Sequence, residues 1–182
     1  MSYRQLLNLN YGNTASGAAY ASSTSLTDVT ADPQFPLPAN QFPVGGTCVL
    51  FAHGIISTTG TPTIKLGFYY GGIAGVALGV SPATATGNNA ASWPWILRWQ
   101  GSVRTIGGSG TIMGIGELLL GTSLSVFAAS IPLVPTSGAA NAVQTIDTTT
   151  TKPITVGAQW GTNNAANTLL LQGFTVEDLA RV

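Results

Sequence analysis

The chain has 182 residues, of which only 7% are charged, and its six Lys and Arg residues balance its six Asp and Glu residues. Soluble globular domains usually carry about 25% charged residues. With no net charge and no basic cluster, the chain lacks the positively charged surface that binding to a phosphate backbone requires. We therefore expect no direct nucleic-acid partner. A near-zero net charge favours association, and we therefore expect the chain to assemble with other proteins.

Residues 1–24 are predicted to form an extended N-terminal arm, followed by one domain over residues 25–182. A Gly, Ala, Ser, Asn and Thr stretch without periodicity fills most of the arm, which therefore cannot build a core of its own. Its few apolar side chains would become buried only against another surface. The candidate partner-binding residues are Tyr3, Leu6, Leu7 and Leu9.

Strands are predicted over residues 47–58 and 63–70, after four prolines between positions 33 and 43 that exclude helix and central strand. In the first strand, apolar side chains occupy both sides of the period of two, so both faces are expected to be buried. In the second, every other residue from Ile64 to Tyr70 is apolar, and the alternate face is expected to be wetter.

The clearest strand signal lies in residues 94–105, which alternate over a whole strand length. The residues expected to be buried are Trp95, Leu97, Trp99 and Val103, and those expected to be exposed are Arg98, Gln100, Ser102 and Arg104. The glycine-rich stretch 107–110 suits a hairpin turn, so residues 111–120 are predicted to return antiparallel to this strand.

Three more strands are predicted over residues 124–134, 153–160 and 167–179, with residues 161–164 as a hairpin turn between the last two. No stretch of ten or more residues holds a helical period. About eight strands joined by Gly- and Pro-rich turns predict an all-β fold, an antiparallel β-sandwich whose expected form is a jelly roll.

The uncharged stretch over residues 118–146 does not predict a membrane span. Glycine and proline interrupt it at Gly121, Pro132, Pro135 and Gly138, so no apolar helix of about 20 residues fits. We expect no membrane partner.

Residue types for catalysis are scarce, because His53 is the only histidine and Cys48 the only cysteine. No Gly-x-Ser-x-Gly motif accompanies His53, and its expected role is that of a hydrogen-bonded structural residue. The chain also lacks the motifs for zinc, calcium and phosphate binding. We therefore predict no catalytic residue, no metal and no cofactor. The pair Glu177 and Asp178 is interpreted as a charged guard on a sheet edge.

Trp93 is the candidate for a glycan contact, because it lies at a strand edge whereas Trp95 and Trp99 fall on the predicted core face. Sugar binding would be favoured if Trp93, Tyr69 and Tyr70 were exposed and coplanar.

The segment Ser-Thr-Thr-Gly-Thr-Pro-Thr-Ile-Lys-Leu-Gly-Phe at residues 57–68, together with residues 95–120 and 160–177, resembles a group of tailed-bacteriophage virion proteins. The shared features are a Thr-Gly-Thr-Pro turn before a Leu-Gly-aromatic strand and a Val-Arg-Thr-Ile-Gly hairpin. The resemblance covers residues 25–179.

The resemblance implies a jelly-roll structural subunit of the virion, assembled in the host cytoplasm and without catalytic residues. The implied function is a capsid decoration protein that binds the major capsid protein, or another virion protein, as a homo-oligomer with a trimer as the expected order. A minor tail, baseplate or fibre subunit is the alternative, and a carbohydrate-binding sandwich is the second. One module with a short arm and no coiled-coil or repeat segment favours decoration. An enzyme comes third and would need His53 exposed beside an acid.

Overall fold

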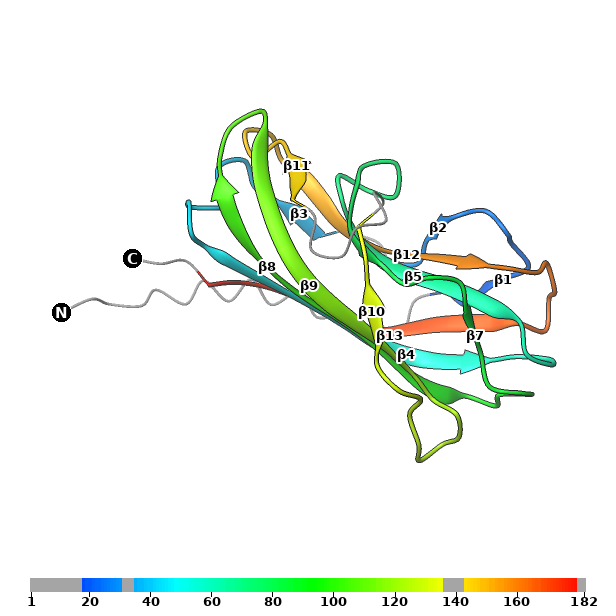
Figure 1. Ribbon diagram of the computed structural model, residues 1–182. Helices are drawn as coiled ribbons and strands as arrows, with labels where there is room; N and C mark the ends of the chain where they lie inside the picture. The colour runs from blue at the N-terminus through cyan, green and yellow to red at the C-terminus, as the bar shows by residue number, and fades with distance from the viewer. Residues whose placement is uncertain (1–17, 31–34, 136–142, 180–182) are drawn as a thin grey trace.

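The computed structural model describes residues 18–30, 35–135 and 143–179. These residues form two antiparallel β-sheets packed against each other, and no helix occurs among them. Figure 1 shows the long, curved strands β8 and β9 in one layer, with β5 and β12 in the other. The predicted all-β sandwich is confirmed. Residues 1–17, which make up most of the predicted arm, lie outside the described residues.

The larger sheet, sheet A, has seven strands in the order β1-β13-β4-β8-β9-β10, with β11 also paired to β9. Its strands are β1 (Tyr20–Ala21), β4 (Thr47–Ser57), β8 (Trp93–Thr105), β9 (Gly110–Leu120), β10 (Ile131–Leu133), β11 (Gln144–Ile146) and β13 (Thr168–Leu179).

The smaller sheet, sheet B, has six strands in the order β2-β12-β5-β6, with β3 also paired to β12 and β7 to β5. Its strands are β2 (Thr27–Asp28), β3 (Phe35–Leu37), β5 (Thr63–Tyr70), β6 (Val76–Val80), β7 (Thr84–Ala85) and β12 (Lys152–Trp160).

Strand β8 follows the predicted alternation. The four residues expected in the core are buried and the four expected outside are exposed. The predicted hairpin with β9 is also present, and it places Arg98 opposite Glu117 and Gln100 opposite Ile115. The period of two was enough to predict which β8 side chains are buried, because only one face of β8 contacts the other sheet.

The predicted hairpin between the last two strands is wrong. Strand β12 pairs with β5 in sheet B, whereas β13 pairs with β4 in sheet A, so residues 161–167 cross between the layers. The Asn167 side-chain oxygen accepts a hydrogen bond from the Thr59 N–H at 2.9 Å, which ties this crossing to the one between β4 and β5. Strand β12 is buried on both faces and is paired on both sides, so it offers β13 no open edge.

Two other strand predictions need correction. Of residues 124–134, residues 131–133 pair with β9 as β10, Phe127 and Val134 form only isolated bridges, and residues 124–130 form a largely exposed loop. The outer face of β4 is not fully buried, because Phe51 is half-buried and His53 is exposed. The apolar residues on this face therefore reflect something other than the core of the sandwich.

Sheet B also departs from the prediction. Strand β6 was not predicted, because four glycines between positions 71 and 79, three of them before the strand, hide the strand period. Tyr69, placed on the wetter face of β5, is only 7% exposed. Its ring covers Gly157 of the neighbouring strand, where an added Cβ would lie 2.5 Å from the ring and 3.1 Å from Leu26. Packing on the outer face of sheet B thus buries Tyr69, which the alternation of the sequence alone assigns to solvent.

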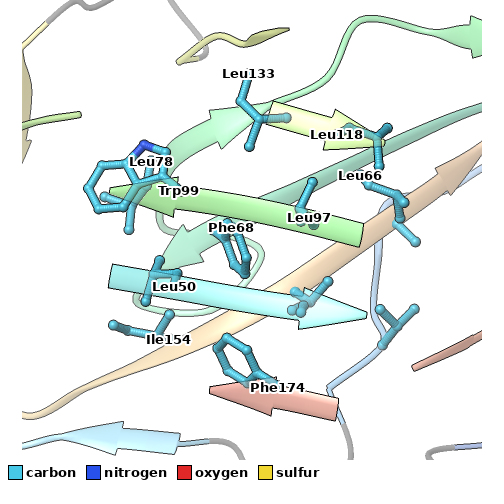
Figure 2. Packing of buried hydrophobic residues seen from close by; sticks show 14 of the residues in the cluster. Leu50, Leu66, Phe68, Leu78, Leu97, Trp99, Leu118, Leu133, Ile154 and Phe174 are labelled. Atoms are coloured by element: carbon cyan, nitrogen blue, oxygen red, sulfur yellow. The ribbon is translucent and has the colours of Figure 1, made fainter. Parts of the chain in front are cut away.

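The Trp99 indole lies between the two sheets in a space left open by glycines. An added Cβ would lie 2.1 Å from the indole at Gly101, 2.3 Å at Gly114, and 2.9 Å at Gly79 in sheet B. Trp99 is 2% exposed, and Figure 2 shows it in the cluster that also contains Leu133. Because protein interiors are close-packed, the indole can occupy this place only if these three positions carry no side chain.

We expect Gly114→Ala to lower the free energy of unfolding by about 1–3 kcal/mol, as overpacking of a filled core does. Its Cβ would also meet the Gln100 carbonyl oxygen at 2.5 Å, which belongs to the paired backbone and cannot easily move. Gly108→Ala is the matched control, since a Cβ there meets nothing within 4 Å. Denaturant unfolding of both variants measures the difference, and an equal effect of the two would contradict this packing.

Tyr70 links the end of β5 to the loop between β11 and β12. Its hydroxyl donates a hydrogen bond of 2.7 Å to the Asp147 carbonyl oxygen. Burial, and secondarily the negative charge of Asp147, raises the pKa of Tyr70 to about 12. The pKa of Asp147 itself is lowered, chiefly by a hydrogen bond from the Thr149 hydroxyl. Tyr70 is therefore neutral in the folded protein under conditions in which a free tyrosine would begin to ionise.

Stability should fall as the pH rises from about 10 to about 12. The unfolded chain releases the Tyr70 proton near pH 10, whereas the folded protein keeps it until about pH 12. This contribution is complete below pH 10 and is lost as the pH passes through the folded pKa. Tyr70→Phe should make the melting temperature less sensitive to pH in this range. Some dependence should remain because burial also raises the pKa of Tyr69. A variant with the wild-type pH dependence would contradict the assignment.

Candidate interaction surface

The aromatic residues considered for glycan binding do not form an exposed platform. Tyr69 and Tyr70 are buried. Trp93 is half-buried at the start of β8, packed against the core, with its ring 2.0 Å from where a Cβ at Gly87 would lie. The arm residues Tyr3, Leu6, Leu7 and Leu9 lie outside the described residues.

His53 lies exposed on the outer face of sheet A, in contrast to the structural role predicted for it. Its ring centroid lies 5.6 Å from that of Phe51. The residues paired with it on the adjacent strands are Gly173 and Ile96, neither of which carries a carboxylate. Cys48 is buried on the opposite, inner face of the same strand. In the described parts of the chain, no three His, Cys, Asp or Glu residues gather as a metal site would require.

A groove runs over β4, β8 and β9 on the outer face of sheet A, with a volume of about 460 Å³. We call it the sheet A groove. The outward-facing residues that line it are Val49, Phe51, Arg98, Gln100, Ile115 and Glu117, and Ser130 and Pro132 close one side.

Strand register brings the lining residues together in two rows across the sheet. In one row, Phe51 pairs with Arg98, which pairs with Glu117. In the next, Val49 pairs with Gln100, which pairs with Ile115. Because residues directly opposite each other on antiparallel strands have Cβ atoms about 4.5–5.5 Å apart, each row forms a continuous strip of side chains.

One ion pair lies within the groove. Arg98 Nη2 is 3.0 Å from Glu117 Oε1, and the two side chains are 51% and 34% exposed. The Ser130 hydroxyl donates a hydrogen bond to the other oxygen of Glu117. The two charges thus neutralise each other within the wall. The groove carries no net charge that would select a strongly charged partner.

The apolar character of this face is unusual for the outside of a sandwich. Ile115 on β9 is 63% exposed, and Phe51 on β4, on the other side of β8, is half-buried. A second hollow of about 450 Å³ shares Gln100 and Ile115 with the groove and continues along β8 and β9 toward Arg104. An exposed apolar area with a polar border is typical of a protein contact surface.

A second apolar feature is the loop between β9 and β10, which we call the apolar loop (residues 121–130). It presents Leu124, Val126 and Phe127 with exposed fractions of 71%, 53% and 38%. Backbone hydrogen bonds close it: the Val126 carbonyl accepts from the Thr122 and Ser123 N–H groups, and the Leu120 carbonyl accepts from the Ala128 N–H. Figure 1 shows the loop extending beyond the ends of the neighbouring strands of sheet A.

Neither feature was predicted from the sequence, although a signal for the groove was present. In residues 110–120, Ile115 and Leu119 are apolar on the side of the pattern that faces away from the core residues Ile112 and Leu118. In residues 47–58, apolar side chains on both sides of the strand are interpreted as burial within the sandwich. They also fit a strand whose second face binds another molecule.

Comparison of the chain with protein-family models, with curated proteins and with solved structures found no match. Across the described ranges, no helix has the length and apolar character needed to span a membrane.

Truncating a side chain on the inner face of β8 should cost more stability than truncating one on its outer face. We expect Trp99→Ala to cost about 3–5 kcal/mol of stability, as large aromatic truncations in a core do. Arg98→Ala should cost less than about 1 kcal/mol, because its ion pair is largely solvated. Thermal or denaturant unfolding of the two variants tests the assignment, and a larger loss for Arg98→Ala would invert it.

Proposed function

We propose that the chain is a non-catalytic structural subunit of a virion, as its likeness to tailed-phage proteins implies, and that it contacts its neighbours through the outer face of sheet A. The observation that carries this proposal is the sheet A groove. Phe51 and Ile115 present apolar surface there that the sandwich does not use for its own core. A protein with so few charges gains by covering such a face with a partner.

The strand order supports a jelly roll. If β2 and β3 count as one strand, the main strands in chain order are β1, β2/β3, β4, β5, β6, β8, β12 and β13. Sheet A then reads first-eighth-third-sixth, and sheet B reads second-seventh-fourth-fifth. This order is the one expected of an eight-stranded jelly roll, an architecture found in viral capsid proteins. Strands β9, β10 and β11 extend sheet A beyond that framework. A fold does not fix a function, so this point supports the proposal without carrying it.

The surroundings of His53 support a role without catalysis. A Ser-His-Asp arrangement needs a carboxylate that orients the imidazole and a hydroxyl that the imidazole can deprotonate. The cross-strand neighbours of His53 are instead glycine and isoleucine, and its ring lies against Phe51. We infer that His53 belongs to the contact surface.

Among virion roles, we favour capsid decoration over a minor tail, baseplate or fibre subunit. The described residues form one sandwich, which suits a subunit that covers a lattice better than an elongated fibre. A closed homo-oligomer, with a trimer as the expected order, would use the apolar faces without open-ended growth. The carbohydrate-binding alternative loses support because Tyr69 and Tyr70 are buried.

Purified particles and the isolated protein together test the proposal. We expect the full chain to sediment with particles in a density gradient and to rebind particles that lack it. Ile115→Asp should weaken rebinding at least about tenfold, because it places an unpaired charge in the contact. Ala83→Asp, which adds the same charge at an exposed site next to sheet B, should bind like the wild type.

Retention of the chain in the soluble fractions, away from particles, would contradict a structural role in the virion. Equal binding by Ile115→Asp and Ala83→Asp would leave the structural role in place but would remove the sheet A groove as its contact surface.

A further inference from the structure

The apolar loop and the sheet A groove are an exposed protrusion and an exposed hollow on the same chain. We propose that the apolar loop of one copy inserts into the sheet A groove of a second copy. This inference rests on the proposed structural role, and it identifies one partner of that surface as another copy of the chain.

The apolar loop is built to keep its shape in solution. The Phe127 backbone forms a β-bridge with Gly121, and the Thr122 hydroxyl donates a hydrogen bond of 3.2 Å to the Val126 carbonyl. At its base, the Gly121 N–H donates to the Pro94 carbonyl at 2.7 Å. A loop already held in this way loses little conformational entropy when it binds, which favours its use as an anchor.

The groove matches the loop in chemistry. Leu124, Val126 and Phe127 carry no charge, and the groove offers them Phe51 and Ile115. Burial of apolar side chains in a hollow that excludes water favours association. The Arg98 and Glu117 charges already pair with each other, so an uncharged loop leaves neither of them without a partner.

The apolar residues of the loop do not line the groove of their own chain, although Ser130 at the end of the loop does. The base of the loop is bound beside Pro94, whereas the groove begins at Arg98, about 13 Å further along β8 at the usual rise per residue. The loop extends past the strand ends in the opposite direction (Figure 1). We infer that the contact joins two copies, either reciprocally about a two-fold axis or head to tail in a ring that closes.

Paired cysteine variants test this contact in the full chain. Cys48 is buried and should stay unreactive. Differently tagged Ile115→Cys and Leu124→Cys proteins would be mixed, allowed to exchange subunits and treated with a short bismaleimide. We expect a mixed cross-linked dimer from this pair, formed at least about tenfold faster than from either variant alone. Ile115→Cys mixed with Ala83→Cys is the control and should give no enrichment.

A second measurement does not depend on cross-linking. Leu124→Asp should raise the dissociation constant of self-association at least about tenfold, measured by sedimentation, with an unchanged melting temperature because Leu124 is exposed. Ser109→Asp, at the exposed turn between β8 and β9, is the matched control and should leave association unchanged.

Three outcomes would overturn the inference. The first is a wild-type chain that stays monomeric. The second is an Ile115→Cys variant that cross-links mainly to itself, as a two-fold contact of groove with groove would give. The third is an Ile115→Cys variant that cross-links to Leu7→Cys in the arm in preference to Leu124→Cys. In each case, continued sedimentation of the wild-type chain with particles would leave the proposed virion role standing.

Discussion

The packing of the Trp99 indole against glycines of both sheets is the constraint on which the rest of the structure depends. The indole fills the space over Gly101 and Gly114 in sheet A and reaches Gly79 in sheet B. That contact determines which side of β8 faces the core. Because side chains alternate along a strand, it also determines that Arg98 and Gln100 face outward. The β8–β9 register then places Glu117 and Ile115 beside them, so core packing and groove formation are two results of one alternation.

The outer face differs from that of an isolated, solvated sheet. The charges of Arg98 and Glu117 neutralise each other within the groove wall, and Phe51 and Ile115 provide apolar surface around them. The apolar loop adds a protrusion of the same character at one end of the sheet. A chain with only 12 formally charged residues, six of each sign, has little electrostatic repulsion to keep copies apart. These features together favour a protein whose surface is completed by assembly.

The sequence predicted the fold class and the facing of β8 because period-2 alternation and glycine turns are local signals. It did not predict the partners of β12 and β13, since Gly161 and Asn164 suit a hairpin turn and a crossing between sheets equally well. The proposed contact surface was missed for a related reason. Apolar residues on both sides of β4 and β9 look the same whether the second face is covered by the same chain or by another one. Trp93 was selected from its place at a strand edge. Because Gly87 has no side chain, the Trp93 ring can pack inward against it.

The central claim is that the outer face of sheet A becomes covered on assembly. Hydroxyl-radical footprinting of the full-length protein, dilute and then assembled, measures this for individual side chains. The account predicts that Phe51, Ile115, Leu124 and Phe127 lose reactivity on assembly, while Ile73 near the outer face of sheet B keeps its reactivity as an internal reference. Unchanged reactivity of Ile115 and Leu124 in the assembled protein, or protection of Ile73 alone, would contradict it.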